Sequence, residues 1–169
     1  QGQVGKELKT VANEQGFTVI AAGRNELDVT KLEKVKSYIQ SKNADIVINA
    51  AAYTAVDKAE EEQDIAYAIN RDGASNLARA SKEQNIPLLH ISTDYVFDGS
   101  QADAYCENDA VSPLGIYGAS KWQGEEAIRE ELAQHIILRV AWVFGAQGDN
   151  FVKTMLRLEQ DQYELNVVA

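Results

Sequence analysis

Cysteine and histidine are scarce in this sequence. Cys106 is the only cysteine, and there are two histidines among 169 residues. An internal disulfide framework is therefore excluded, and a His/Cys zinc site is disfavoured. A single cysteine fits a reducing compartment, which predicts a cytoplasmic protein. We predict no metal bound by the protein's own side chains, while a magnesium dependence is left open.

Long apolar runs and basic clusters are also missing. No run approaches the roughly 20 apolar residues that a membrane helix needs, and no basic stretch precedes an apolar core at the start of the sequence. The formal net charge is -10, and Lys and Arg form no continuous stripe. Neither a membrane nor a nucleic acid is therefore an expected partner, and we interpret the acidic charge as surface solubility.

The sequence does contain short apolar runs that alternate with longer amphipathic segments, and 45% of its residues are hydrophobic. The apolar runs predict strands at residues 17–22, 45–50, 87–92 and 136–141. Apolar positions three and four apart predict helices at residues 3–15, 30–42, 64–85 and 117–133. This alternation is typical of a parallel sheet covered on both faces. The predicted fold class is α/β, a doubly wound, Rossmann-like parallel sheet.

Both ends of the sequence depart from a complete sheet of this kind. Residues 1–5 lead straight into a predicted helix, where a preceding strand is expected. Residues 164–169 read as a strand with nothing after it. We therefore expect one NAD(P)-binding, Rossmann-like domain over residues 1–169 that is incomplete at both ends and lacks its first strand.

Candidate cofactor residues follow the predicted strands, because ligands bind at the carboxyl ends of the strands in open α/β sheets. Gly2 and Gly5 are spaced like the last two glycines of a Gly-x-x-Gly-x-x-Gly turn, although this spacing alone is weak evidence. Arg24 stands where an acid would favour NAD and an arginine accommodates the 2′-phosphate of NADP. It favours NADPH, with NADH as the alternative, unless it is an ordinary surface arginine.

Two further segments are placed to contact a dinucleotide. Asp28 and Val29 follow Arg24 closely and are candidates for the adenine. The small side chains of residues 50–52 would let a flat ring lie against the backbone, or else they serve tight packing in the core.

The pattern Tyr-x-x-x-Lys occurs twice, so its spacing alone identifies no site. Tyr38 and Lys42 lie at the end of a predicted helix that leads into a strand, on the wrong side of the sheet, and we interpret them as structural. Tyr117 and Lys121 share one face of a predicted helix near a loop that can reach the carboxyl ends of the strands.

Tyr117, Lys121 and Thr93 form a chemically sensible set. A phenol with a pKa of about 10 is a poor proton shuttle at neutral pH, and a nearby ammonium lowers that pKa. Thr93, at a strand end, would donate a hydrogen bond to a carbonyl oxygen that becomes negative, or else it satisfies the backbone.

Together these segments closely resemble the dTDP-4-dehydrorhamnose reductase family of extended short-chain dehydrogenase/reductases, over essentially the whole chain. The resemblance is carried by residues 2–5, 49–60, 92–99, 113–114, 117–121 and 124–125. It implies NAD(P)H-dependent reduction of the 4-keto group of dTDP-4-dehydro-L-rhamnose to dTDP-L-rhamnose, a precursor of cell-surface polysaccharides. A dTDP-sugar is the implied partner, and a homodimer is compatible with it.

The resemblance also assigns roles by motif position. Tyr117 would donate a proton to the sugar O4, with Lys121 also binding the nicotinamide ribose and Thr93 completing the catalytic trio. It implies cofactor contacts at Gly2, Gln3, Val4, Asp28, Val29, Ala52, Tyr53 and Thr54, and substrate contacts at Thr93, Asp94 and Trp142. Trp142 is alternatively a core aromatic beside its strand.

Two alternatives stay open at this point, because the family's first glycine and its C-terminal, sugar-binding portion have no counterpart here. The chain is alternatively a non-catalytic, NADP-binding regulatory subunit, as the regulatory β subunit of methionine adenosyltransferase is in this family. Another sugar-nucleotide reductase or epimerase is the third interpretation.

Overall fold

The computed structural model describes the backbone of residues 2–161 and the side chains of residues 2–159. The chain divides into two compact units, residues 22–141 and the pair of segments 1–21 and 142–169. The strand predicted at residues 164–169 lies outside the described residues.

The larger unit, residues 22–141, contains a three-stranded parallel sheet. Its strands are β1 (Val47–Asn49), β2 (Leu88–Thr93) and β3 (His135–Val140), in the order β1-β2-β3. The other elements of this unit are α2 (Leu32–Lys42), α3 (Val56–Ala59), α4 (Gln63–Tyr67), the π-helix η1 (Ala68–Asp72), α5 (Gly73–Gln84), the 3₁₀-helix η2 (Asp94–Val96) and α6 (Ile116–Glu131). Helices between parallel strands confirm the predicted α/β class.

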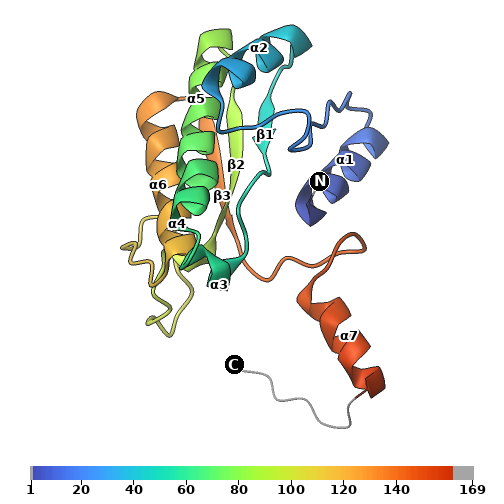
Figure 1. Ribbon diagram of the computed structural model, residues 1–169, viewed down its shortest axis with the longest axis vertical. Coiled ribbons are helices and arrows are strands. Elements are labelled where there is room, and N and C mark those ends of the chain that lie inside the picture. Colours follow the sequence, from blue (N-terminus) through green and yellow to red (C-terminus); the bar gives the residue numbers. More distant parts are fainter. Residues whose placement is uncertain (1, 162–169) are drawn as a thin grey trace. The chain divides into compact units, whose positions relative to one another are not determined.

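The core lies between one face of this sheet and helices α2, α5 and α6. Leu88 from β2 packs there with Val35, Leu77 and Ile128, all of them buried. Figure 1 shows α5 and α6 running side by side along the strands. The other face carries Ile136, which is 54% exposed. Within this unit the described helices therefore cover one face of the sheet, whereas the sequence predicted two covered faces.

The smaller unit contains α1 (Gln3–Glu14) and α7 (Phe151–Asp161). The strand predicted at residues 17–22 is absent from this structure, and that prediction was wrong. Phe17 and Ile20 in this segment are exposed by 69% and 49%. An alternating apolar pattern shows only that a segment suits a half-buried pleated surface, and a strand forms when a neighbour supplies the hydrogen-bonded ladder.

The helix predicted at residues 64–85 is divided by the π-helix η1 into α4 and α5. A π-turn places one extra residue in the helix and changes the direction of the side chains after it. Here it contains the buried Asn70, and Gly73 at the start of α5 lies against Val29, whose Cγ2 is 2.7 Å from where a Cβ would stand. This turn directs Asn70 toward neighbouring segments.

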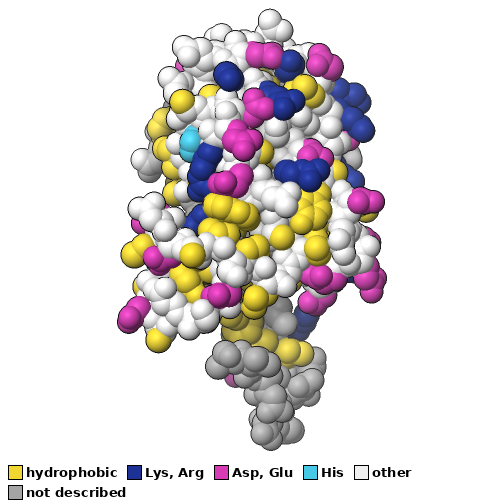
Figure 2. Space-filling model, turned by 90° about the vertical axis from the view of Figure 1, so that its left-hand side faces the viewer, with side chains coloured by type: hydrophobic (Ala, Val, Ile, Leu, Met, Phe, Trp, Pro, Cys, Tyr) yellow, Lys and Arg dark blue, Asp and Glu magenta, His cyan; other side chains and the backbone are white. Residues whose placement is uncertain are grey.

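On the outer face of α5 and α6, acidic and basic side chains are interspersed, as Figure 2 shows for the side at the left of Figure 1. Within the described range, no helix has both the length and the apolar character that crossing a bilayer demands. The same residues contain no cluster of three or more His, Cys, Asp and Glu side chains suited to a metal ion.

Candidate active site

The site is built around the start of α6, which is held by a residue far away in the sequence. The N-cap residue of α6 is Gly115, which has no side chain to cap the helix. Glu60 takes this role, because its Oε1 accepts a hydrogen bond from the Ile116 N–H at 2.8 Å. A carboxylate at this position satisfies a free N–H and interacts favourably with the helix dipole. Tyr117 therefore stands in the first turn of a fixed helix.

Two glycines allow α6 to lie directly on the backbone of neighbouring elements. A Cβ at Gly118 would stand 2.1 Å from the Tyr95 carbonyl oxygen, and one at Gly124 would stand 2.2 Å from the Asn70 carbonyl oxygen. Both separations are far too short for any side chain. This close approach brings the first turn of α6 to the carboxyl end of β2.

At that end of β2, Tyr117 meets Thr93. Thr93 is 4% exposed, and its Oγ1 donates to Asp94 Oδ1 at 3.1 Å and accepts from the Tyr95 N–H at 3.2 Å. The Tyr117 ring packs edge-on against the Tyr95 ring, with centroids 5.5 Å apart. Burial raises the pKa of the Tyr117 phenol, although hydrogen bonding to Thr93 opposes the rise. Tyr117 is therefore a protonated acid at neutral pH.

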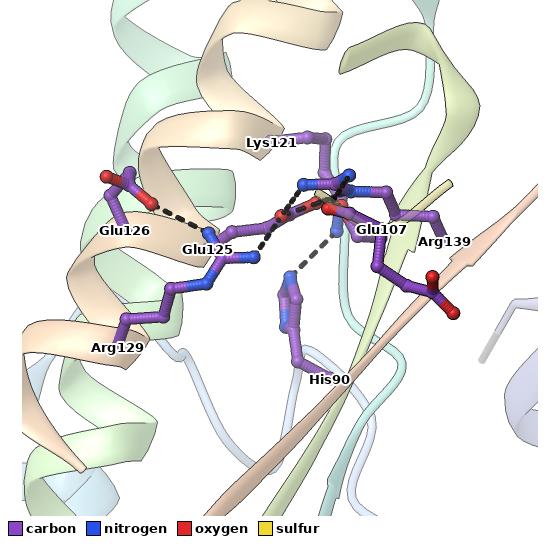
Figure 3. Close-up of polar contacts among 8 residues, drawn as sticks. His90, Glu107, Lys121, Glu125, Glu126, Arg129 and Arg139 are labelled. Carbon is purple, nitrogen blue, oxygen red and sulfur yellow. Dashed lines mark hydrogen bonds and ion pairs between the residues drawn. The ribbon is translucent and has the colours of Figure 1, made fainter. Parts of the chain in front are cut away.

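Lys121 follows one helical turn later and points into the protein, where it is 1% exposed. Its Nζ donates to the Ile91 carbonyl at 2.6 Å and lies 3.2 Å from His90 Nε2 (Figure 3). Desolvation lowers the pKa of Lys121 to about 8, against an opposing effect of Glu125. Lys121 Nζ is thus hydrogen-bonded to β2. Lys121 is not among the groups that shift the pKa of Tyr117, so the predicted lowering of that pKa is not found.

The lowered pKa of Lys121 predicts a pH-dependent stability. Between about pH 8 and pH 10.5 the unfolded chain binds a proton that the folded chain has released. The free energy of unfolding should therefore rise with pH through this window, by up to about 3 kcal/mol. Below about pH 8 the buried lysine is charged in the folded protein, and the whole cost of burying that charge lowers the stability. Urea unfolding at several pH values measures this rise. A Lys121→Met variant should lack it, and equal pH dependence in the two proteins would contradict the prediction.

A buried ion-pair network lies behind Lys121, and the sequence reasoning gave it no role. Glu125 is fully buried, and its Oε1 accepts a hydrogen bond from Ser92 Oγ at 2.5 Å. Its Oε2 accepts from Arg139 Nη2 at 2.7 Å, as Figure 3 shows. Arg129 Nη2 donates to the same carboxylate at 3.0 Å. The network ties α6 to β2 and β3 and fixes the helix that carries Tyr117.

A second missed residue, Asn70, fixes the loop that follows β1. Its Oδ1 accepts from the Tyr53 N–H at 2.8 Å, and its Nδ2 donates to the Tyr53 carbonyl at 3.1 Å and to Ser120 Oγ at 2.9 Å. The Tyr53 hydroxyl donates to Glu62 at 2.6 Å, and this bond raises the pKa of Tyr53 to about 12. The predicted cofactor segment at residues 52–54 is thereby joined to α6.

The other predicted cofactor residues of this unit lie in a turn before α2. Arg24 is exposed. Asp28 Oδ1 accepts from the Thr30 N–H and hydroxyl at 3.0 and 2.7 Å, and these bonds lower the pKa of Asp28. The Val29 carbonyl accepts from Asn76 Nδ2 at 2.9 Å. Hydrogen bonds from Thr30 and Asn76 therefore hold the turn that contains Asp28 and Val29.

In the smaller unit, Gly2 is the N-cap residue of α1, and Gln3 and Val4 begin its first turn. The predicted phosphate-binding residues thus stand at a helix start. Trp142 is 71% exposed and packs edge-on against Phe151, with ring centroids 5.0 Å apart.

The second Tyr-x-x-x-Lys pair has a different environment. Lys42 Nζ lies 4.9 Å from the centre of the Tyr38 ring at the end of α2, which is followed by Asn43 with a φ of 47°. This end of α2 precedes the amino end of β1. Tyr38 and Lys42 therefore lie away from the carboxyl ends of the strands, as expected of a structural pair.

Comparison with known proteins identifies consistent relatives. A family model described as the RmlD substrate binding domain matches residues 1–169. The dTDP-4-dehydrorhamnose reductases of Sinorhizobium fredii and Aggregatibacter actinomycetemcomitans are 45% and 46% identical over 99% of this chain. The chain spans 56% and 58% of the length of these two relatives.

Solved structures give the same result. The chain is similar to dTDP-4-dehydrorhamnose reductase from Bacillus anthracis in complex with NADP, with a TM-score of 0.94 and 41% identity over 97% of this chain and 58% of that one. The orthologue from Clostridium acetobutylicum has a TM-score of 0.96 and 40% identity, over 99% of this chain and 60% of that one.

Proposed function

We propose, on the premise that this chain belongs to the RmlD substrate binding domain family, that the protein reduces dTDP-4-dehydro-L-rhamnose to dTDP-L-rhamnose with NADPH. The observation that carries this proposal is the half-buried Tyr117 phenol beside Thr93 at the carboxyl end of β2. Such a phenol is placed and protonated as a general acid for a ketone oxygen.

In this reaction the reduced nicotinamide, when bound, supplies the hydride to C4 of the sugar. Tyr117 donates its proton to O4, where negative charge develops. Burial keeps the phenol protonated at neutral pH. The Thr93 hydroxyl beside it, which donates to Asp94 in the free protein, turns to donate a hydrogen bond to the substrate oxygen. Asp94 and Trp142 are the further side chains that we propose for contact with the sugar.

The residues present fit a dinucleotide. No side chain caps the start of α1 in the described part of the chain, so its first N–H groups are available to a pyrophosphate. Glycine at position 2 leaves this backbone accessible, since even a Cβ there would meet nothing within 4 Å. We propose cofactor contacts at Gly2, Gln3, Val4, Arg24, Asp28, Val29, Ala52, Tyr53, Thr54, Tyr117 and Lys121.

The proposal is tested by following NADPH and NADH oxidation by the purified protein with enzymatically prepared dTDP-4-dehydro-L-rhamnose. We expect turnover with NADPH and dTDP-L-rhamnose as the product. NADPH binding without turnover, together with a stably associated enzyme in pull-downs, would instead support the regulatory subunit. Conversion of another dTDP-sugar would support a different reductase or an epimerase.

Arg24 is expected to determine the preference for NADPH. Its guanidinium is exposed and suited to a charge-assisted hydrogen bond with a 2′-phosphate. Such bonds contribute about 1.5–3 kcal/mol, so Arg24→Ala should raise the Kd for NADPH roughly 10- to 100-fold and leave the Kd for NADH unchanged. Fluorescence titration with each cofactor measures both constants. An equal loss of affinity for the two would show that Arg24 does not contact the 2′-phosphate.

Two expectations about the protein's surroundings remain proposals. The dTDP-sugar is the proposed small-molecule partner, and a homodimer is the assembly to be tested by sedimentation. We also keep the cytoplasm as the predicted location, because Cys106 is an exposed free thiol, which fits a reducing compartment.

A further inference from the structure

A buried hydrogen-bonded chain leads from β1 through β2 to Lys121. Asn49 and His90 are paired across the sheet, and both are almost fully buried. Asn49 Nδ2 lies 2.8 Å from His90 Nδ1, and His90 Nε2 lies 3.2 Å from Lys121 Nζ. Neither Asn49 nor His90 is among the residues proposed for catalysis or cofactor binding.

The orientation of the Asn49 side-chain amide is fixed by the loop after β1. The Ala51 N–H donates to Asn49 Oδ1 at 3.0 Å, which requires the amide oxygen at that position. Asn49 Nδ2 therefore faces His90. An amide NH₂ can only donate, so His90 Nδ1 must accept with its lone pair.

The tautomer of His90 follows from this contact. Burial lowers the pKa of His90 to about 2, so the imidazole is neutral and carries one proton. Because Nδ1 is the acceptor, that proton is on Nε2, and the Nε2–H faces Lys121 Nζ. An ammonium has no lone pair to accept this bond, whereas a neutral amine does.

We propose that Asn49 and His90 form a relay that presents an N–H donor to Lys121 and thereby favours its neutral amine over its ammonium form. His90 is then a positioning residue, since it acts through Lys121. The amine accepts from His90 Nε2–H and still donates to the Ile91 carbonyl, so the side-chain nitrogen and oxygen atoms of Asn49, His90 and Lys121 all have partners.

The charged groups around Lys121 do not prevent the relay from favouring the neutral amine. Glu125 on α6 favours the ammonium, but its carboxylate is shared with Arg139 from β3 and with Arg129. From β2 the neutral His90 is the titratable group that contacts Nζ, beside the Ile91 carbonyl. Desolvation and the relay therefore act in the same direction, against a carboxylate whose charge is largely compensated.

The consequence for catalysis rests on the proposed function. After Tyr117 has given its proton to the substrate oxygen, its phenolate must be protonated again. The ammonium form of Lys121, with its lowered pKa, releases a proton more readily than an ordinary lysine. Because Nζ is bonded to the Ile91 carbonyl and His90, this proton passes through water: an N–H bond of the ammonium breaks, and the O–H bond of Tyr117 forms. The neutral amine left behind accepts from His90 Nε2–H until solvent returns a proton to it.

The relay is tested by NMR on the purified protein without substrate or cofactor, so that its failure and that of the reductase proposal are distinguishable. Long-range ¹H–¹⁵N spectra identify which imidazole nitrogen carries the proton. We expect His90 to carry it on Nε2, and a proton on Nδ1 would overturn the proposal. His135 is the second histidine of the chain and serves as an internal control.

Substitution of Asn49 should then reverse the tautomer. In Asn49→Asp the carboxylate accepts from Nδ1–H, so the proton should move from Nε2 to Nδ1 while the His135 signals stay unchanged. A His90 that keeps its proton on Nε2 in this variant would contradict the relay.

Titration of ¹³Cε-labelled lysine measures the effect on Lys121, whose signal is identified by its loss in Lys121→Met. His90→Leu removes the N–H donor, and His90→Gln offers a carbonyl oxygen to the ammonium. Both should raise the apparent pKa of Lys121, with an expected increase of about tenfold in its proton affinity for His90→Gln. An unchanged or lower pKa in either folded variant would overturn the proposal. His90→Gln keeps the test decisive if His90→Leu does not fold.

Discussion

Tyr117→Phe is expected to lower the turnover number about 10²- to 10⁴-fold, the usual contribution of a positioned general acid. The phenylalanine ring keeps the edge-on contact with Tyr95 and loses only the hydroxyl that bonds to Thr93. The Kd for NADPH should therefore change far less than the turnover number, because the ring at position 117 is kept and the other proposed cofactor contacts are unaltered. Steady-state kinetics with the keto-sugar and fluorescence titration with NADPH separate the two effects.

Tyr38→Phe is the matched control for this prediction. It removes the same hydroxyl from the other Tyr-x-x-x-Lys pair, whose ring lies against Lys42 at the end of α2. Turnover should not change in this variant. If Tyr117→Phe retained the activity of the unaltered protein, Tyr117 would not be the proton donor.

The strands of the larger unit could be predicted from the sequence because each is a short apolar run. The runs at residues 45–50, 87–92 and 136–141 contain or overlap β1, β2 and β3. The run at residues 17–22 has a similar pattern, yet it forms no strand. Hydrophobicity indicates which segments suit a sheet, whereas a strand also depends on a paired neighbour, which the pattern of one segment does not contain.

That Tyr117 and Thr93 lie close together could also be predicted, because one topological rule applies to both residues. Thr93 ends a parallel strand, and Tyr117 lies in the first turn of the helix that packs beside that end. The rule that ligands bind at the carboxyl ends of strands places both at one edge of the sheet. It also separates Tyr117 from Tyr38, which the spacing alone could not do.

The partners of Lys121 could not be predicted in this way. Helical spacing places Lys121 on the same face as Tyr117, but it does not show that Nζ turns inward to the Ile91 carbonyl and His90. That direction depends on the depth of the space between α6 and β2. The role of Asn70 could not be predicted for a similar reason. The direction of its side chain depends on a π-turn, which the spacing of apolar residues does not indicate.

Glu125→Gln is expected to lower the free energy of unfolding by about 3–5 kcal/mol, as typically happens when one partner of a buried ion pair is removed. The variant keeps the shape of the side chain but leaves Arg139, 14% exposed, without its compensating charge. Urea unfolding measures the change. Glu126→Gln is the matched control, because its ion pair with Arg129 is exposed and should contribute less than about 1 kcal/mol.

A double variant distinguishes the lost charge balance from a general intolerance of change at this position. In Glu125→Leu/Arg139→Met both charges are removed together, and two apolar side chains of similar volume replace the pair. Much of the stability lost in Glu125→Leu alone should return, because no uncompensated charge remains buried between α6 and β3. Ser92 Oγ still loses its acceptor in both variants, so recovery should fall short by roughly 1–3 kcal/mol. A double variant no more stable than Glu125→Leu would show that packing around residue 125, and not its charge, holds α6 against the sheet.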